Sequence, residues 1–431
     1  MRRFILWLLV LIILGLPLAF AAVAVQTQPF LPETSALSPQ TAAGSRALVS
    51  RLRRTARETQ GVAEISATAA EIDGLIATAA RAFPGLRGRT TIDEARITIA
   101  ASFPLPPGGG SLWINAGVRI PASPLGIEPS LVRLGRVDLP PELALTVLVA
   151  LLDWATTDDV GTLLVESVQA VRTAPQEVTA LVDTGGTGED NLFSRAAAGA
   201  REAAGLDGGE AARAHFAAMA AAAARGDLPS EGSALPWLRF ALARVAAAGH
   251  PGPLSARPDV RAALLALAAH CGDRSAMETV AGKMAPGTEG TGSACSGATL
   301  GGRDDLRKHF TLSAAFAAAG GSSVSWGLGE VKELVDAGRA GGSGFSFDDV
   351  AADRAGIAFA EQALGAGPRG LSWMLSVMGE EGAVMPSIEG LPSFMSEPEF
   401  AARYGDVEDP RYDAQIEEID GRIAALEALS R

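Results

Sequence analysis

The sequence has little lysine, and its basic residues are outnumbered by acidic ones. Of 431 residues, 36 are Lys or Arg and 49 are Asp or Glu, so the net charge is −13 at neutral pH. A nucleic-acid partner requires clustered cations, and this balance argues against one. Only Lys283, Lys308 and Lys332 are lysines. Since an ammonium and a guanidinium are not interchangeable when buried, a lysine in this arginine-rich chain is a mild sign of a specific role.

Signatures of common enzyme classes are also missing. The chain has no Gly-x-Ser-x-Gly elbow, no Walker phosphate loop, no His-Glu-x-x-His and no Cys-x-x-Cys. Its four histidines, His215, His250, His270 and His309, lack the spacing of metal ligands. We therefore predict neither a resident metal nor a cofactor, and we favour a protein that is not an enzyme.

Long apolar runs are absent except at the N-terminus. Residues 4–25 are an uncharged apolar stretch of 22 residues behind Met1-Arg2-Arg3. As a helix this stretch spans about 33 Å, enough to cross a bilayer core. The two arginines predict a cytoplasmic N-terminus, which makes the protein a single-pass inner-membrane protein with most of its chain in the periplasm.

A cleavable signal peptide is the alternative. Its apolar region would be residues 4–16, followed by Pro17 and the small-residue site Ala19-Phe20-Ala21. In that case the mature protein is released into the periplasm. Both interpretations export about 400 residues.

The chain has only two cysteines, Cys271 and Cys295. Disulfides persist in oxidising compartments, and we predict that this pair is bonded. The bond would close a loop of about 25 residues and stabilise the protein by about 3 kcal/mol. The segment between the two cysteines is rich in Gly and Thr, and a cross-link would help to hold it in place.

Changes in hydrophobic period predict an α+β fold in two domains. Residues 1–25 are the anchor or signal, and residues 26–40 form an extended Pro- and Thr-rich linker. Residues 41–184 are predicted to be an α+β domain with an antiparallel sheet. Residues 190–431 are predicted to be an Ala-rich, all-α helical domain.

In the first domain, alternation of apolar residues predicts two antiparallel hairpins and a third strand. The strands are expected at 95–105, 112–120, 131–139, 167–173 and 177–182. On the first hairpin the alternating set that includes Ile97, Phe103, Ile114 and Ala116 is expected to face the core. A preceding helix at 42–58 carries several arginines, which form either a solvated face or a contact with anionic headgroups.

In the second domain the apolar period becomes helical. Helices are predicted at 191–204, 210–225, 235–248, 258–270, 304–319, 324–337, 347–364 and 413–429. Polar residues concentrate on three successive helices between 303 and 356. Asp305, His309 and Ser313 recur every four residues, which places them on one helical face.

The next two helices supply partners for that face. Lys332, Glu333 and Asp336 lie on one of them, and Asp353 lies one turn beyond Asp349 on the other. Ser346 and Asp349 have the spacing of a capping box. Gly356 allows a neighbouring helix to approach closely.

Three interpretations of this polar set remain open. It is a buried network that fixes helix packing, or a catalytic centre, or a site for a divalent cation such as calcium or manganese. In the catalytic case His309 would be the general base, Glu333 or Asp336 the orienting or acid group, and Lys332 the group that stabilises an anion.

The same segment resembles known families. Its order resembles the short motif of YfiM-like predicted periplasmic lipoproteins and, more distantly, the membrane-embedded VanZ-like family. The matching residues are His309-Phe310, Ser313, Gly329, Lys332-Glu333, Asp336, Ser343-Gly344-Phe345-Ser346, Asp349, Asp353 and Gly356. The resemblance covers about 55 residues and implies an envelope location but no reaction. The chain departs from the lipoproteins because it has no cysteine near its N-terminus.

Two shorter segments are similar to parts of single-anchor exported proteins of Gram-negative bacteria. Residues 132–140 resemble an element of small anchored YpmS-like domains, and residues 400–412 resemble a tail segment of the same class. We expect a membrane-anchored envelope protein with a structural or interaction role, whose partner is another envelope protein or the cell wall. The alternatives are an envelope hydrolase and a module that binds a lipid-like ligand between Ile99, Phe103 and Leu148.

Overall fold

The computed structural model describes most of the chain after the apolar N-terminus. The described residues are 23–32, 39–83, 85–105, 111–155, 159–186, 191–203, 209–274, 277–278, 284, 294–321 and 344–430. The predicted anchor up to residue 22 and the predicted helix at 324–337 lie outside them.

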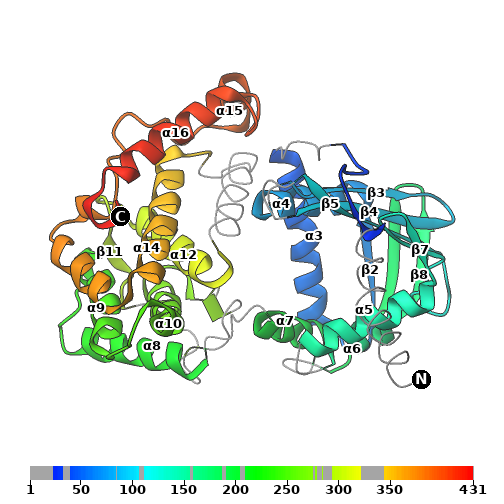
Figure 1. Cartoon of the computed structure of the whole chain (residues 1–431), viewed down its shortest axis with the longest axis horizontal. Helices are drawn as coiled ribbons and strands as arrows, with labels where there is room; N and C mark the ends of the chain where they lie inside the picture. Colours follow the sequence, from blue (N-terminus) through cyan, green and yellow to red (C-terminus); the bar gives the residue numbers. More distant parts are fainter. Residues whose placement is uncertain are drawn as a thin grey trace, which may run out of the picture. The chain divides into compact units, whose positions relative to one another are not determined.

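The chain divides into two compact units (Figure 1). The first comprises Met1–Ser35 and Gly44–Gly199, and the second comprises Ala36–Ala43 and Ala200–Arg431. The sequence had suggested a boundary at 184–190. The division instead falls within a helix, α7 (Leu192–Ala203).

The first unit contains a six-stranded antiparallel sheet in which β3, β4, β5, β6 and β7 are neighbours in chain order. The predicted hairpin is present as β4 and β5. The predicted third strand is in fact two short strands, because Gly135, at φ 59°, turns the chain back on itself. The strands are β1 (Val25–Gln26), β3 (Arg87–Ile92), β4 (Arg96–Leu105), β5 (Leu112–Pro121), β6 (Leu131–Leu134) and β7 (Val137–Leu139).

The predicted linker at 26–40 is wrong for its first part. Val25 and Gln26 form β1, which pairs with β5 at Ile114 and Trp113. The backbone N–H of Phe30 donates to Asn115 Oδ1 at 2.9 Å and to Ser102 Oγ at 3.1 Å.

This segment also changes which side of the hairpin is buried. Ser102 and Asn115 are register partners on β4 and β5, and both are 0% exposed. The predicted inward set includes Phe103 and Ala116. Ser102 and Asn115 lie on the opposite face of the strands. The polar pair is buried because residues 26–30 supply its hydrogen bonds, so hydrophobic alternation alone gave the wrong side at this end of the hairpin.

A second sheet has three strands in the order β2, β9, β8. Its β8–β9 pair is the second predicted hairpin, whereas β2 was not predicted. Thr68 caps the start of helix α4 in a capping box, in which Thr68 and Glu71 satisfy each other's backbone N–H. The elements are α3 (Pro39–Glu58), β2 (Val62–Thr68), α4 (Ala69–Ala82), α5 (Pro141–Ala155), α6 (Val160–Ser167), β8 (Val168–Ala174) and β9 (Glu177–Asp183).

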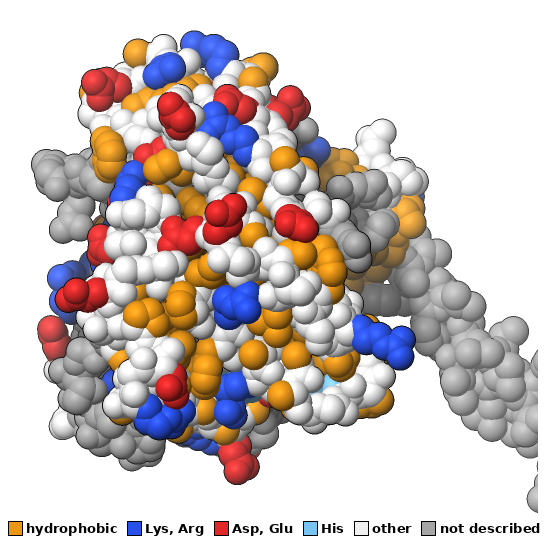
Figure 2. Space-filling model, turned by 90° about the vertical axis from the view of Figure 1, so that its left-hand side faces the viewer, with side chains coloured by type: hydrophobic (Ala, Val, Ile, Leu, Met, Phe, Trp, Pro, Cys, Tyr) orange, Lys and Arg blue, Asp and Glu red, His pale blue; other side chains and the backbone are white. Residues whose placement is uncertain are grey.

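The second unit is mainly helical, but it is not all-α. Two short strands, β10 and β11, pair in parallel, and they bring residues 231–233 beside residues 297–299. One face of this unit shows acidic and basic side chains interspersed with apolar ones (Figure 2). The elements are α8 (Gly209–Ala224), β10 (Glu231–Ser233), α9 (Leu235–Ala247), α10 (Pro253–Cys271), β11 (Gly297–Thr299), α12 (Asp304–Gly320), α14 (Phe347–Val377), α15 (Glu397–Tyr404) and α16 (Pro410–Ala424).

Helices α12 and α14 make the most extensive helix–helix contact in this unit. Where they meet, Gly356 of α14 lies directly against the backbone of Phe310 on α12, and an added Cβ would overlap the Phe310 carbonyl oxygen. The predicted role of Gly356 in close helix approach is therefore confirmed. Further along, α14 bends at Gly367, which has φ 63° and precedes Pro368.

This contact yields a prediction about stability. We expect Gly356→Ala to lower the free energy of unfolding by about 3 kcal/mol, because the new methyl group must push two packed backbones apart. Gly365→Ala in the same helix is the matched control, since no atom lies within 4 Å of a Cβ there. The control should be neutral or stabilising by up to about 1 kcal/mol. Equal midpoints for the two variants in urea unfolding would contradict the proposed contact.

Candidate functional site

A polar cluster lies where α12 and α14 begin. Arg303 stands immediately before α12 and donates hydrogen bonds to Asp305 at 2.7 and 3.0 Å and to Asp348 at 2.6 Å. A longer contact of 3.3 Å joins it to Asp349. Asp348 and Asp349 are in the first turn of α14, where the helix dipole also favours negative charge. One guanidinium thus connects the N-terminal ends of both helices.

His309 lies between two carboxylates of α14. Its Nδ1 is 3.1 Å from Asp353 Oδ1, and its Nε2 is 3.4 Å from Asp349 Oδ2. Ser313, one turn further along α12, donates to the same oxygen of Asp353 at 2.6 Å. The exposed fractions of the His309, Asp349 and Asp353 side chains are 8%, 4% and 4%. The Nδ1 atom is within hydrogen-bonding distance of Asp353, whereas the contact between Nε2 and Asp349 is longer.

Among the described residues, four carboxylates of the cluster face one guanidinium and one imidazole. The carboxylates belong to Asp305, Asp348, Asp349 and Asp353. In the part of the chain that the structure describes, Asp348 Oδ1 and Asp353 Oδ2 are buried and accept no hydrogen bond. Removing Arg303 from this cluster would take away a positive charge that faces several buried carboxylates.

Ion pairing shifts the pKa values at the outer edge of the cluster. The hydrogen bond to Asp305 raises the pKa of the Arg303 guanidinium, and the same bond lowers the pKa of the Asp305 carboxyl. Both groups are therefore charged throughout the physiological range.

The structure brings together only part of the predicted set. Asp305, His309 and Asp353 belong to one cluster, and His309 contacts Asp353 directly. Lys332, Glu333 and Asp336 lie outside the described residues, so their predicted convergence remains a prediction.

Two neighbours of the cluster differ from expectation. The side chain of Ser346 makes no capping bond to α14, and Asp349 instead faces Arg303 and His309. Arg303 and Asp348 were not among the predicted residues. The charge-rich start of each helix was visible in the sequence, but no spacing rule joins two helix ends that are 45 residues apart.

The sequence also missed a second polar cluster, centred on Asp259 of α10. Asp259 lies 2.7 Å from His215 Nε2 and 2.9 Å from His250 Nε2. Arg244 donates to His215 Nδ1 at 3.3 Å, so the imidazole proton of a neutral His215 is on Nε2. Burial alone would raise the pKa of Asp259, but the hydrogen bonds from His250 and His215 outweigh it and hold the pKa below its usual value.

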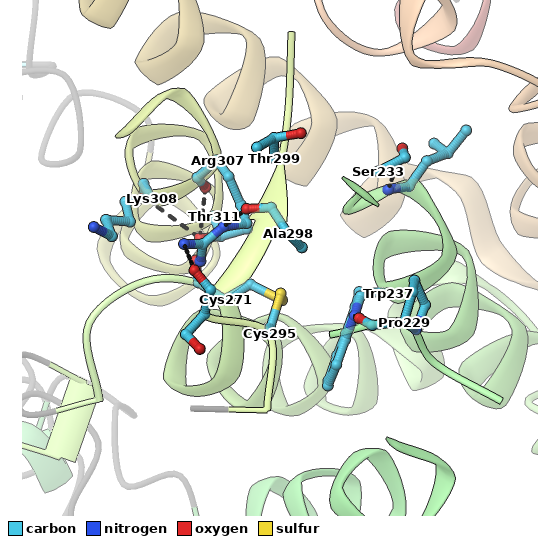
Figure 3. Close-up of a disulfide and its surroundings, with 12 residues drawn as sticks. Pro229, Ser233, Trp237, Cys271, Cys295, Ala298, Thr299, Arg307, Lys308 and Thr311 are labelled. Atoms are coloured by element: carbon cyan, nitrogen blue, oxygen red, sulfur yellow. Dashed lines mark hydrogen bonds between the residues drawn. A yellow bond between two sulfur atoms is a disulfide. The ribbon is translucent and has the colours of Figure 1, made fainter. Parts of the chain in front are cut away.

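The predicted disulfide is confirmed, because Cys271 and Cys295 are bonded. Beside it lies Arg307, a guanidinium that is almost completely buried (Figure 3). Arg307 donates to the backbone carbonyls of Ala298, Cys271 and Ser296, and desolvation lowers its pKa. The disulfide and Arg307 together tie the end of α10 and the start of β11 to α12.

Comparison of the chain with protein-family models, curated proteins and solved structures finds no match in any of the three. The resemblance to the YfiM-like and VanZ-like motif therefore stays a prediction. Across the described residues, no three or more His, Cys, Asp or Glu side chains are arranged to hold a metal ion.

The cluster yields a prediction with a neighbouring control. We expect His309→Ala to lower the free energy of unfolding by about 3–5 kcal/mol, because it removes the imidazole that contacts the buried carboxylates of Asp349 and Asp353. Lys308→Ala removes an exposed ion pair with Asp304 from the same helix and should change stability by less than about 1 kcal/mol. Chemical unfolding of both variants measures the difference. Similar losses would contradict a stabilising role for the buried His309.

The disulfide yields another prediction. We expect the double variant Cys271→Ala/Cys295→Ala to lose about 3 kcal/mol of stability, because the unfolded chain gains the conformational freedom of an open loop. Thermal unfolding with and without a reducing agent provides the measurement. The reductant should lower the melting temperature of the parent protein and leave the double variant unchanged. A parent protein that is insensitive to full reduction would contradict the expectation.

Proposed function

We propose that this chain is an envelope protein of structural or interaction type, exported and held at the inner membrane by its apolar N-terminus. Two features support export. Residues 4–25 are uncharged and apolar behind two arginines, and the cysteine pair forms a disulfide, as is typical of oxidising compartments. Of the helices that the structure describes, none is both long and apolar enough to cross a membrane.

The observation that carries the structural role is the sealing of the polar cluster. His309, Asp349 and Asp353 are almost inaccessible to solvent, and each ring nitrogen of His309 faces a carboxylate. A general base needs a free nitrogen within reach of a substrate proton. This arrangement favours a network that holds α12 against α14 over the alternative hydrolase with His309 as its base.

The ligand-binding alternative for the first unit is less well supported. Ile99 packs against the buried cluster of Ala69, Ile92 and Ile97, whereas Leu148 is exposed on α5. Two of the three residues proposed to line a common cleft are thus in different environments. We therefore expect a partner to bind an exposed surface of one of the units, and not a cleft between these three residues.

Fractionation of cells that produce the full chain tests location. We expect the protein to stay in the membrane pellet after alkaline carbonate extraction, because a bilayer-spanning segment resists that treatment. We also expect protease to digest a C-terminal tag in spheroplasts without lysis. Recovery as a shortened soluble periplasmic protein would replace the anchor with a cleaved signal. Recovery from the cytosol with both thiols reduced would overturn the proposal.

A further inference from the structure

Helix α5 presents apolar side chains to solvent. Residues 143–152 carry no charge, and none of the described side chains of α5 is buried. Five of its large apolar side chains are exposed, with exposed fractions from 38% to 85%. Exposed apolar residues gathered on one element mark an interaction site rather than ordinary surface. These side chains are Leu143, Val147, Leu148, Leu152 and Trp154.

Helix α5 is packed and hydrogen-bonded against α6. Asp153 of α5 accepts hydrogen bonds from Thr162 of α6, at 3.0 Å from the backbone N–H and 2.6 Å from the hydroxyl. Gly161 allows α6 to approach α5 so closely that a Cβ there would lie 2.6 Å from the Val149 carbonyl oxygen. Leu164 of α6 adds another exposed apolar side chain. We call α5 and α6 together the α5–α6 hairpin.

Exposed apolar residues are unevenly divided between the two units. Among the described residues, twelve of the fourteen large hydrophobic side chains that are exposed belong to the first unit. Six of the twelve lie on the α5–α6 hairpin. The first unit is therefore the one that has an apolar surface to cover.

The position of the N-terminal segment indicates what covers this surface. The apolar stretch ends at β1, which is part of the same sheet as β6 and β7. Val23 accepts a hydrogen bond from the backbone N–H of Arg136 in the β6–β7 turn, and Ala24 is buried. Strand β7 then leads directly into α5. No free linker separates the end of the stretch from the unit that carries the hairpin.

We propose that the α5–α6 hairpin lies in the interfacial layer of the bilayer that holds the apolar N-terminal stretch preceding β1. This inference rests on the proposed membrane anchor. Tryptophan is favoured at that depth because its ring is apolar and its N–H can meet polar groups, and Trp154 is the most exposed large apolar residue described. Neither helix of the hairpin contains Lys or Arg. Apolar burial, not attraction to anionic lipid, therefore drives the contact.

Site-specific labelling of the full chain tests this contact. The natural cysteines are bonded to each other, so Leu148→Cys or Trp154→Cys introduces the one reactive thiol. Val62→Cys is the matched control, because Val62 is in the same unit and is 51% exposed, against 54% for Leu148. Each variant is labelled with an environment-sensitive fluorophore and reconstituted in phosphatidylcholine vesicles. Half of the samples contain lipid brominated near the headgroup end of its acyl chains.

We expect bromolipid to quench the label at 148 and at 154 at least twofold, with the label about 5–10 Å below the headgroups, and to leave the label at 62 unchanged. Added phosphatidylglycerol should make no difference, and Val147→Glu should reduce quenching at 154. A blue-shifted but unquenched label at 148 would show that protein covers the hairpin, which overturns the proposal. So would a label that stays in water while the chain remains membrane-bound. A chain absent from the vesicles would contradict the anchor itself.

Discussion

The helical unit depends on the close approach of α12 and α14. At Gly356 the backbones touch, so the two helices share one tightly packed seam. Their N-terminal ends then bring four carboxylates close to Arg303 and His309, and the Arg303 guanidinium offsets the repulsion between like charges there. Glycine at the seam and ion pairing at its end are two parts of the same constraint.

Arginine is used repeatedly to close the ends of helices in this unit. Helix C-termini leave backbone carbonyls without partners, and their partial negative charge favours a nearby cation. Arg307 binds the end of α10, Arg261 donates to the Ala318 carbonyl near the end of α12, and Arg239 donates to the Leu375 and Met378 carbonyls at the end of α14. Alanine side chains cannot supply such bonds, so an Ala-rich helical unit relies on long side chains from neighbouring helices.

In the first unit, the residues that follow the apolar N-terminal stretch join a sheet. The chain enters as β1 beside β5, and the following residues bury the polar pair Ser102 and Asn115. Meanwhile α5 keeps its apolar side chains outside. The apolar N-terminal stretch and the exposed apolar side chains of α5 therefore belong to the same unit.

The sequence alone determined the local features of this protein. Alternation predicted the β4–β5 and β8–β9 hairpins, the helical period predicted α8, α9, α12 and the start of α14, and the cysteine count predicted the disulfide. These predictions succeeded because the hairpins and helices depend on neighbours along the chain, and two cysteines allow only one pairing. Spacing also placed His309 and Ser313 on one face, and Asp353 is the residue that meets both.

Only the tertiary structure decided which distant groups meet. It joined Arg303 to Asp348, brought His215 and His250 to Asp259, paired β10 with β11, and laid residues 25–30 over Ser102 and Asn115. Each of these contacts bridges separate elements, and a period along one helix or strand carries no information about the element that packs against it. The physical reason is that burial is shared between surfaces, so a polar residue becomes interior when another segment supplies its hydrogen bonds.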